Sequence, residues 1–228
     1  MKITVVNGQS HKGSTYHIGK MLADKLGGKV TEFFLPKDFS DMCIGCTSCF
    51  IKNEHLCPHH ARLEKLTNAI DDADVLIFTS PVYVYHTTGT MKSFLDHYRW
   101  MVHRPEKSMF SKQAVCISTA ARAGTKSTNK DIADSFFFWG IPKIYKYGVN
   151  VRATSYNGIS ENTLKAIDKK TTALAKKIKA KDGKVKVGIK TKAFFELMRI
   201  IQRKSDWNEA DTDYWHNKGW DGKKRPWK

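Results

Sequence analysis

The 228-residue sequence has no long apolar run, and no window of eighteen residues is apolar throughout. A membrane-crossing helix needs about 20 such residues, and the apolar-leaning run after Met1 stops at Asn7-Gly8, too early for a secretion signal. We therefore expect a cytoplasmic protein with no membrane partner. In that reducing compartment thiols stay free or bind metals, which disfavours a disulfide framework.

Acidic residues are scarce, with 22 Asp and Glu against 39 Lys and Arg, so the formal net charge is +17. The excess is regional, because residues 165–228 hold nineteen basic and only eight acidic residues. These lysines follow a helix face and a tail, and no nucleic-acid recognition motif surrounds them. The pattern favours a solvated basic surface and no nucleic-acid partner.

The sequence also lacks the G-x-x-x-x-G-K-[ST] and G-x-G-x-x-G motifs, which disfavours a triphosphate P-loop and a classical dinucleotide fold. What it contains is an alternation of β-rich and amphipathic segments. Strands are expected at 2–8, 29–35, 74–84, 113–120 and 143–151, and helices at 14–28, 61–73, 90–103, 125–140 and 160–180. This alternation predicts an α/β fold with a parallel sheet covered by helices on both faces.

Two regions follow from this pattern. Residues 1–185 are expected to form the α/β domain, interrupted by a cysteine-rich loop at 43–60, and residues 186–228 a C-terminal helical and aromatic tail. The tail is too polar to form its own core, so its Trp and Tyr side chains should pack on the body or on a second subunit. We expect a homo-oligomer.

Ligands of such sheets bind beyond the carboxyl ends of the strands, which selects the loops after the first, third and fourth strands. The first loop, NGQSHKGST, combines hydroxyls, glycines and a helix start, a combination that suits a phosphate. The second, TSPVYVYHTTGTMK, carries a proline and aromatic side chains that can hold a flat ring.

Together GQSHKGST, SPVYVYHTTGTMKSFLDH and STAARAGTKST resemble the three FMN-binding segments of flavodoxin-like NAD(P)H-dependent FMN reductases. The resemblance covers roughly residues 1–180 and implies a flavodoxin-like five-stranded sheet. It implies that Ser10, Lys12, Ser14 and Thr15 hold the FMN phosphate, that Pro81, Val82 and Tyr83 border the isoalloxazine, and that Thr119, Ala120, Ala121 and Gly124 close the other side. Gln9-Ser10-His11 stands where the family more often has Ser-Pro-Arg, so the role of His11 is open.

The stretch CIGCTSCFIKNEHLCPHH concentrates four of the five cysteines: Cys43, Cys46, Cys49 and Cys57. Its spacing suits a [4Fe-4S] cluster, in which each iron takes one cysteine, and it is similar to the loop of iron-sulfur flavoproteins. Two alternatives stay open: zinc, bound by four thiolates or by three with one of His55, His59 and His60, or a cap beside the flavin without metal. Cys116 stands apart in AVCIS and is expected to be a buried core thiol.

The resemblance implies an FMN-dependent NAD(P)H oxidoreductase that passes electrons to a small-molecule or protein acceptor, with the cluster dividing electron pairs into single steps. No side chain is expected to act as acid or base, because the flavin carries the chemistry. The alternative is a flavodoxin-like electron carrier without substrate turnover. Arg99, His103 and Arg104 near a helix end are expected either at a nicotinamide nucleotide phosphate or in salt bridges with neighbours.

Overall fold

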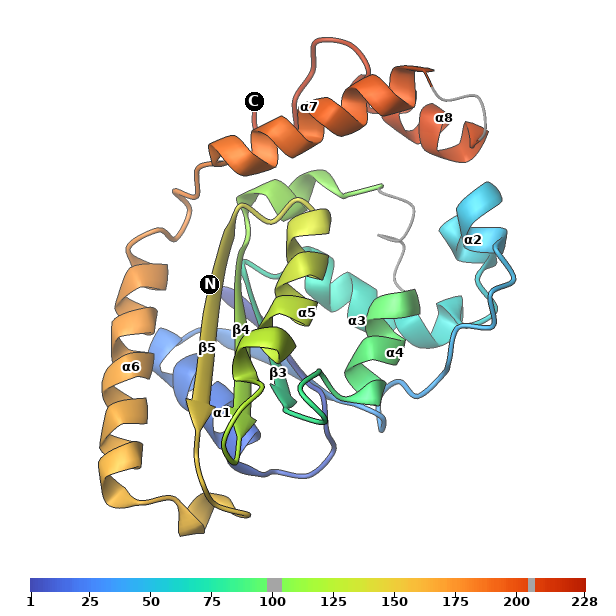
Figure 1. The fold of residues 1–228 in the computed structure, drawn as a ribbon. Helices are drawn as coiled ribbons and strands as arrows, with labels where there is room; N and C mark the ends of the chain where they lie inside the picture. Colours follow the sequence, from blue (N-terminus) through green and yellow to red (C-terminus); the bar gives the residue numbers. More distant parts are fainter. Residues whose placement is uncertain (98–103, 205–207) are drawn as a thin grey trace.

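Five parallel strands form the centre of the molecule in the computed structural model, which describes residues 1–97, 104–204 and 208–228 (Figure 1). The strands are β1 (Lys2–Asn7), β2 (Lys29–Phe34), β3 (Val75–Pro81), β4 (Gln113–Ala120) and β5 (Lys143–Asn150). Their order across the sheet is β2-β1-β3-β4-β5. The predicted α/β fold with a flavodoxin-like parallel sheet is confirmed.

Helices cover both faces of the sheet (Figure 1). The main helices of the α/β body are α1 (Ser14–Leu26), α3 (His60–Asp72), α4 (Gly89–His97), α5 (Thr125–Phe138) and α6 (Glu161–Lys179). The two cores follow from the alternation of side chains along each strand: in β3, Val75 and Ile77 pack with α1 and α6, while Leu76 and Phe78 pack with α3, α4 and α5. Cys116 is fully buried in the second of these cores, as predicted.

Two predicted segments extend further along the sequence than the strand and helix found in the structure. The third strand ends at Pro81 instead of continuing to residue 84, because Val84 and Tyr85 both have positive φ and turn the chain back. The fourth predicted segment, 90–103, begins as α4, and its residues 98–103, with Arg99 and His103, lie outside the described residues.

The C-terminal tail folds into α7 (Ile189–Lys204) and α8 (Glu209–Asn217), which lie at one end of the molecule beyond the sheet (Figure 1). Trp215 and Trp220 are buried against Phe195 of α7 and Phe110 of η3 (Lys107–Ser111). The expectation that tail aromatics pack on the body is met for these residues, whereas Trp207 lies outside the described residues. Among the described residues no helix has both the length and the apolar character to cross a membrane.

Candidate functional site

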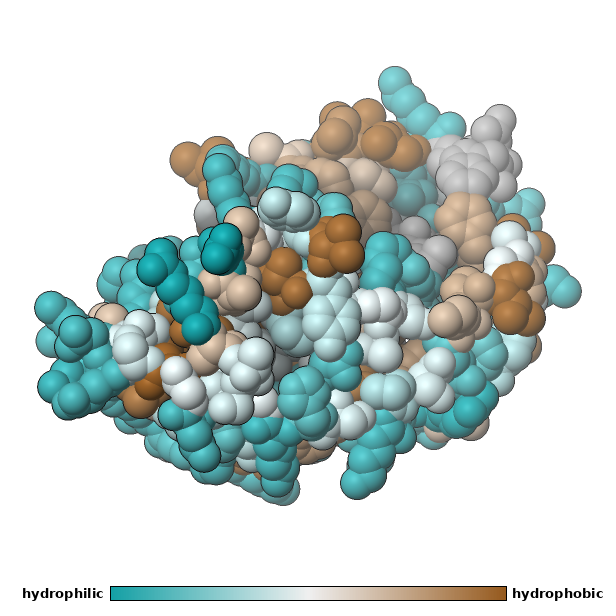
Figure 2. All heavy atoms as spheres, turned by 60° about the horizontal axis from the view of Figure 1, so that its bottom comes forward, coloured by the Kyte–Doolittle hydropathy of each residue, from teal (hydrophilic) through white to brown (hydrophobic). Residues whose placement is uncertain are grey.

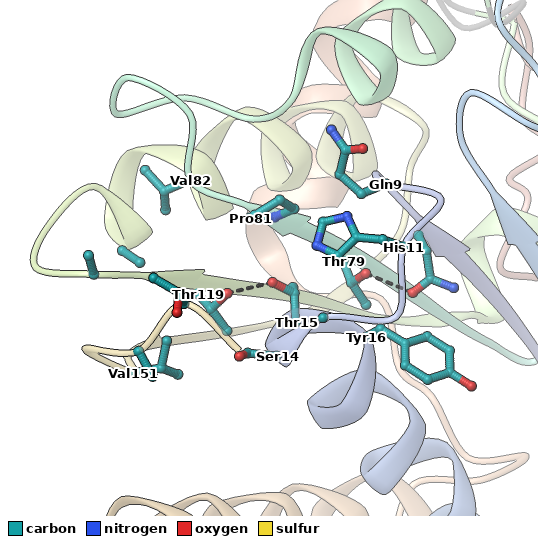
Figure 3. Close-up of a pocket in the computed structure, with 16 residues that line it drawn as sticks. Gln9, His11, Ser14, Thr15, Tyr16, Thr79, Pro81, Val82, Thr119 and Val151 are labelled. Carbon is teal, nitrogen blue, oxygen red and sulfur yellow. Dashed lines mark hydrogen bonds between the residues drawn. The ribbon is translucent and has the colours of Figure 1, made fainter. Parts of the chain in front are cut away.

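A pocket opens at the carboxyl edge of the sheet, where β1, β3 and β4 end (Figure 3). Figure 2 brings the lower side of the Figure 1 view forward and shows a largely hydrophilic surface with hydrophobic groups nearer its middle and upper part. Seven residues predicted to bind FMN line the pocket: Ser14, Thr15, Pro81, Val82, Thr119, Ala120 and Ala121. All three predicted loops therefore meet at one site.

Two hydrogen-bonded pairs lie in the wall of this pocket (Figure 3). The hydroxyl oxygens of Thr15 and Thr119 are 2.5 Å apart and join α1 to β4. The Thr79 hydroxyl donates to the side-chain oxygen of Asn7 over 2.9 Å and joins β3 to β1. All four residues are buried. These buried polar atoms therefore have hydrogen-bond partners within the protein.

The start of α1 offers a site for an anion at the pocket. Gly13 is the residue before the helix, so it supplies no side chain to accept hydrogen bonds from the first N–H groups. The first turn also contains no acidic residue. Unpaired N–H groups and the positive end of the helix dipole both favour negative charge there. The local chemistry fits the phosphate of FMN, with Ser14 and Thr15 as hydroxyl donors.

Two predicted phosphate ligands do not line the pocket. The Ser10 hydroxyl donates to the carbonyl oxygen of Leu35 over 3.3 Å. The Lys12 ammonium nitrogen lies 5.4 Å from the centre of the Tyr16 ring and 6.0 Å from that of Phe34, where cation–π attraction holds it. In this conformation neither side chain is directed at the helix start.

His11, whose role the sequence left open, lies in the pocket wall (Figure 3). Its ring is folded over Gly13, where a Cβ atom would come within 2.7 Å of His11 Nε2. A larger residue at position 13 would therefore displace the His11 ring. Gln9 also lines the pocket, so the segment between β1 and α1 presents an amide and an imidazole instead of an ammonium group.

The loop after β3 forms a tight hairpin from Tyr83 to His86, closed by two backbone hydrogen bonds of 3.0 Å. Val84 and Tyr85 at its tip have φ angles of 47° and 69°. Positive φ is unfavourable for a β-branched residue such as valine, so surrounding contacts must hold the turn. Tyr83, predicted to border the isoalloxazine, is half exposed and stands on this hairpin outside the pocket lining.

Helix α5 supplies those contacts. Ser127 donates a hydrogen bond to the carbonyl oxygen of Tyr85, and Asp131 accepts from the backbone N–H of Thr87 over 3.1 Å. Gly124, at the start of α5, is also outside the pocket lining, but a Cβ atom there would approach Val82 Cγ1 to 2.5 Å. The glycine therefore lets the loop after β4 pack against the loop after β3.

A fourth segment, after β5, was missed by the sequence reasoning. Val151, Ala153 and Thr154 line the pocket beside the three predicted loops. The ring of Tyr156 packs on the ring of His17 with centroids 4.3 Å apart, which ties this segment to α1. Because β5 ends at the same edge as its parallel neighbours, the loop after it could have been expected at the pocket too. Other lining residues that were not predicted are Asn7, Gln9, His11, Tyr16 and Thr79.

The four clustered cysteines line a second, much smaller pocket. Cys43, Cys46, Cys49 and Cys57 meet there, together with residues at the C-terminal end of α4. Cys49 lies on the short helix α2 (Ser48–Ile51), and Cys57 follows η1 (Glu54–Leu56). Cys43 and Cys46 are exposed, while Cys49 and Cys57 are partly buried. The loop therefore brings together the four thiols that the sequence singled out.

The thiols influence one another electrostatically. Burial raises the pKa of Cys49, and the charges of Cys57, Cys46 and Cys43 raise it further. Hydrogen bonds from Ser48 lower the pKa of Cys46. A bound cation would relieve the mutual repulsion of the thiolates.

The donor set fits both metal groups that the sequence leaves open. Four thiolates bind either one zinc ion or the four irons of a cubane cluster. Within residues 1–97, 104–204 and 208–228, no group of three or more His, Cys, Asp or Glu side chains is arranged to hold a single metal ion.

The histidines of the cysteine loop pair with other histidines. His55 Nδ1 lies 3.0 Å from His60 Nε2, and His59 Nδ1 lies 2.7 Å from His97 Nε2. His97 also donates from Nδ1 to the carbonyl oxygen of Ser93 over 2.7 Å. Of these histidines, His59 and His97 line the thiol pocket.

Helix α4 follows the loop that lines the first pocket and ends at the thiol pocket. The loop after β3 leads from the first pocket to Gly89 at the start of the helix, and the thiol pocket includes Asp96 and His97 at its end. Nine helical residues span roughly 13 Å at 1.5 Å per residue. The cysteine segment does leave the carboxyl edge after β2, as expected, but it then runs beside α4, where the Ser93 hydroxyl donates to the Asp41 carbonyl.

A pocket walled by the loops after β1, β3 and β4, on a sheet of order 2-1-3-4-5, is the flavin-binding arrangement of flavodoxin-like proteins. The chain belongs to the NADPH-dependent FMN reductase family, whose family model matches residues 1–155. The predicted family and the predicted NAD(P)H-dependent flavin oxidoreductase activity are confirmed at this level.

Two curated relatives are named as iron-sulfur flavoproteins. The chain is 24% identical over 195 residues to an iron-sulfur flavoprotein of Archaeoglobus fulgidus, covering 85% of this chain and 86% of the relative. It is 29% identical over 137 residues to an iron-sulfur flavoprotein of Clostridioides difficile, covering 56% of this chain and 58% of that protein.

Solved structures show the same fold at lower identity. An azoreductase from Bacillus anthracis aligns with a TM-score of 0.60 and 12% identity, over 78% of this chain and 99% of that one. An apo NADH:FMN oxidoreductase aligns with a TM-score of 0.53 and 15% identity, over 76% of this chain and 88% of that one. At such identities the likeness concerns the fold.

Proposed function

We propose that this protein takes electrons from a nicotinamide nucleotide into FMN at the carboxyl-edge pocket and passes them to an external acceptor through a [4Fe-4S] cluster. The observation that carries the proposal is the gathering of Cys43, Cys46, Cys49 and Cys57 around one pocket in a chain that belongs to an FMN reductase family. The names of the curated relatives support the same reading.

In this proposal the residues of the first pocket bind and orient the flavin. The N–H groups at the start of α1 and the hydroxyls of Ser14 and Thr15 hold the phosphate. Pro81 and Val82 present a stiff apolar edge to the flat ring, with Ala120 on the opposite loop. The bound flavin supplies the hydride chemistry.

The residues of the second pocket hold the cluster. The four thiols become thiolates when they bind iron, and their proximity favours a ligand that neutralises their charge. The cluster supplies one-electron transfer. The partly buried position of Cys49 and Cys57 shields that side of the site, while Cys43 and Cys46 lie at the surface, where an acceptor has access.

Anaerobic purification with metal and flavin analysis tests the proposal. We expect one FMN and about four irons per chain, with visible absorption broader than that of flavin alone. FMN without iron would reject the cluster and leave a simple flavin reductase. One zinc per chain would mean that the cysteine loop has a structural role and no redox role. Steady-state oxidation of NADH and NADPH separates an enzyme from an electron carrier, which turns over neither without a separate reductase.

A further inference from the structure

Arg104 is buried at the junction of three separate segments, with only 3% of its surface exposed. Its Nε donates to Asp211 Oδ1 of α8 over 2.6 Å, and its Nη1 donates to Glu54 of η1 over 3.0 Å. The same guanidinium also donates to two carbonyl oxygens of α2, that of Phe50 over 2.8 Å and that of Cys49 over 3.4 Å. Of the two roles open to Arg104 from the sequence, the salt bridge is the one present.

The contact with α2 fixes a cysteine. Helix α2 has only four residues, so most of its carbonyl oxygens have no partner within the helix. Arg104 supplies donors for the carbonyl of Cys49 and for that of the next residue. A charged donor makes a stronger hydrogen bond than a neutral one. Arg104 thereby contacts the backbone of Cys49 directly.

The position of Arg104 depends in turn on the C-terminal tail. Asp211 lies in the first turn of α8, and Asn208 caps that helix by accepting a hydrogen bond from the Asp211 N–H. Tyr214, one turn later, donates from its hydroxyl to the carbonyl oxygen of Pro105 over 2.8 Å. Trp215 anchors the helix in the buried aromatic cluster of the tail.

Charge and burial make this junction sensitive to loss of a partner. Asp211 is 4% exposed, and burial raises its pKa to about 6, although the Arg104 charge lowers it. The carboxylate is therefore ionised at neutral pH and needs the guanidinium. Removing Asp211 leaves the buried Arg104 with Glu54 as its remaining carboxylate partner among the described residues, and the loss of a buried charged contact is unfavourable. Helices α2 and α8 lie side by side at this point (Figure 1).

We propose that Arg104 and α8 form a clamp that holds the cysteine loop in the conformation that retains its iron-sulfur cluster, although neither supplies a ligand. Arg104 and Asp211 are positioning residues, acting on Cys49 through the end of α2. The effect on cluster retention rests on the proposed function. The clamp itself does not, because its contacts are present in the iron-free chain. It assigns a role to the tail beyond residue 186, which lies outside the region matched by the family model.

The first test measures the rate at which iodoacetamide alkylates each cysteine of the iron-free protein, resolved by mass spectrometry. Asp211→Ala should raise the rate at Cys49 about tenfold, because opening of the loop no longer breaks a buried charged contact. Cys43, already exposed, should keep its rate and serves as the internal reference. The matched control is Asp213→Ala, an exposed carboxylate on the same helix, which should change neither rate.

The second test measures iron loss. After anaerobic reconstitution with iron and sulfide, Asp211→Ala should lose iron to a chelator about tenfold faster than the unmutated protein, with FMN content unchanged. Asp211→Asn keeps the size of the side chain and should show a smaller increase in the rate of iron loss. If the alanine variant fails to fold, the asparagine variant still tests the clamp.

The outcomes separate the two ideas. If Cys49 alkylation is unchanged in both Asp211 variants, the clamp is overturned. It is also overturned if Cys49 alkylation rises but the variants retain iron as well as the unmutated protein does. If no preparation holds iron while Cys49 alkylation still responds to Asp211→Ala, the loop clamp is supported and the cluster proposal fails instead.

Discussion

The hydroxyl oxygens of Thr15 and Thr119 lie 2.5 Å apart, although 104 positions separate these residues in the sequence. Thr15 is the second residue of α1, and Thr119 is the penultimate residue of β4. Both are buried in the wall of the flavin pocket. The contact therefore joins the start of α1 to the end of β4 across the pocket wall.

Thr119→Val keeps the shape of the side chain but leaves the Thr15 hydroxyl buried without this partner. We expect the free energy of unfolding of the apoprotein to fall by about 1–3 kcal/mol, the penalty for an unsatisfied buried polar group. The double variant Thr15→Val/Thr119→Val should recover part of the loss, because both polar groups are then gone. Urea denaturation measures this cycle. Strictly additive losses would mean that the hydroxyls act independently.

His11 and Lys12 are adjacent, but only His11 lines the flavin pocket. We expect His11→Ala to weaken FMN binding by about tenfold, the effect of losing one hydrogen bond near a charged phosphate. Lys12→Ala is the matched control and should change FMN affinity little, since its ammonium group rests over the Tyr16 ring. Titration of apoprotein with FMN, followed by flavin fluorescence, gives both constants. The reverse ranking would restore Lys12 as the phosphate ligand.

Gly124 and Gly183 both have positive φ, at 99° and 63°. A Cβ atom at Gly124 would meet Val82 at 2.5 Å, whereas nothing lies within 4 Å of one at Gly183. Gly183→Ala should therefore carry only the backbone strain, about 1 kcal/mol. Gly124→Ala should lose more stability and also weaken FMN binding, because Val82 must move. Equal stability losses, with FMN binding unaltered, would show that the Val82 contact is unimportant.

Lys112 is buried just before the start of β4, where its ammonium group donates to the carbonyl oxygens of Asp71 and Ala73. Burial lowers its pKa to about 8. Between that pH and the ordinary lysine pKa of about 10.4, the unfolded chain binds more protons than the folded protein. The free energy of unfolding should therefore gain a contribution that rises with pH in this window, by up to about 1.4 kcal/mol per pH unit.

Chemical denaturation at pH 8, 9 and 10 measures the pH-dependent contribution of Lys112 as a difference in the free energy of unfolding between variants. Lys112→Met should remove it, so that its stability relative to the unmutated protein falls as the pH rises. The exposed Lys107→Met in the neighbouring η3 is the control and should keep the dependence of the unmutated protein. A constant difference between Lys112→Met and the unmutated protein would contradict the lowered pKa.

Much of the fold could be predicted because it depends on periodic patterns. In β3 the run VLIFTS alternates between the two cores, so a short buried strand follows from composition and length. Cys116 could be placed in a core because it stands in such a strand. The pocket was located by the rule that parallel strands bring their carboxyl ends to one edge.

Side-chain directions within irregular loops could not be predicted in this way. Whether His11 or Lys12 enters the pocket depends on the backbone angles of a glycine-bounded turn, and no sequence period reports them. The same holds for the turn at Val84 and Tyr85, whose positive φ angles are stabilised by contacts with α5. The pairing of Arg104 with Asp211 spans 107 positions, and only the folded tail makes it visible.

The sharpest prediction on the second pocket compares two cysteines. Cys46→Ser should lower the iron of anaerobically prepared protein well below about four per chain, since each iron of a cubane needs its own thiolate. FMN should remain, because the flavin loops are separate segments. Cys116→Ala is the control: this thiol is fully buried in the core, where burial raises its pKa, and its loss should leave iron and FMN unchanged. Full iron in Cys46→Ser would remove Cys46 from the ligand set.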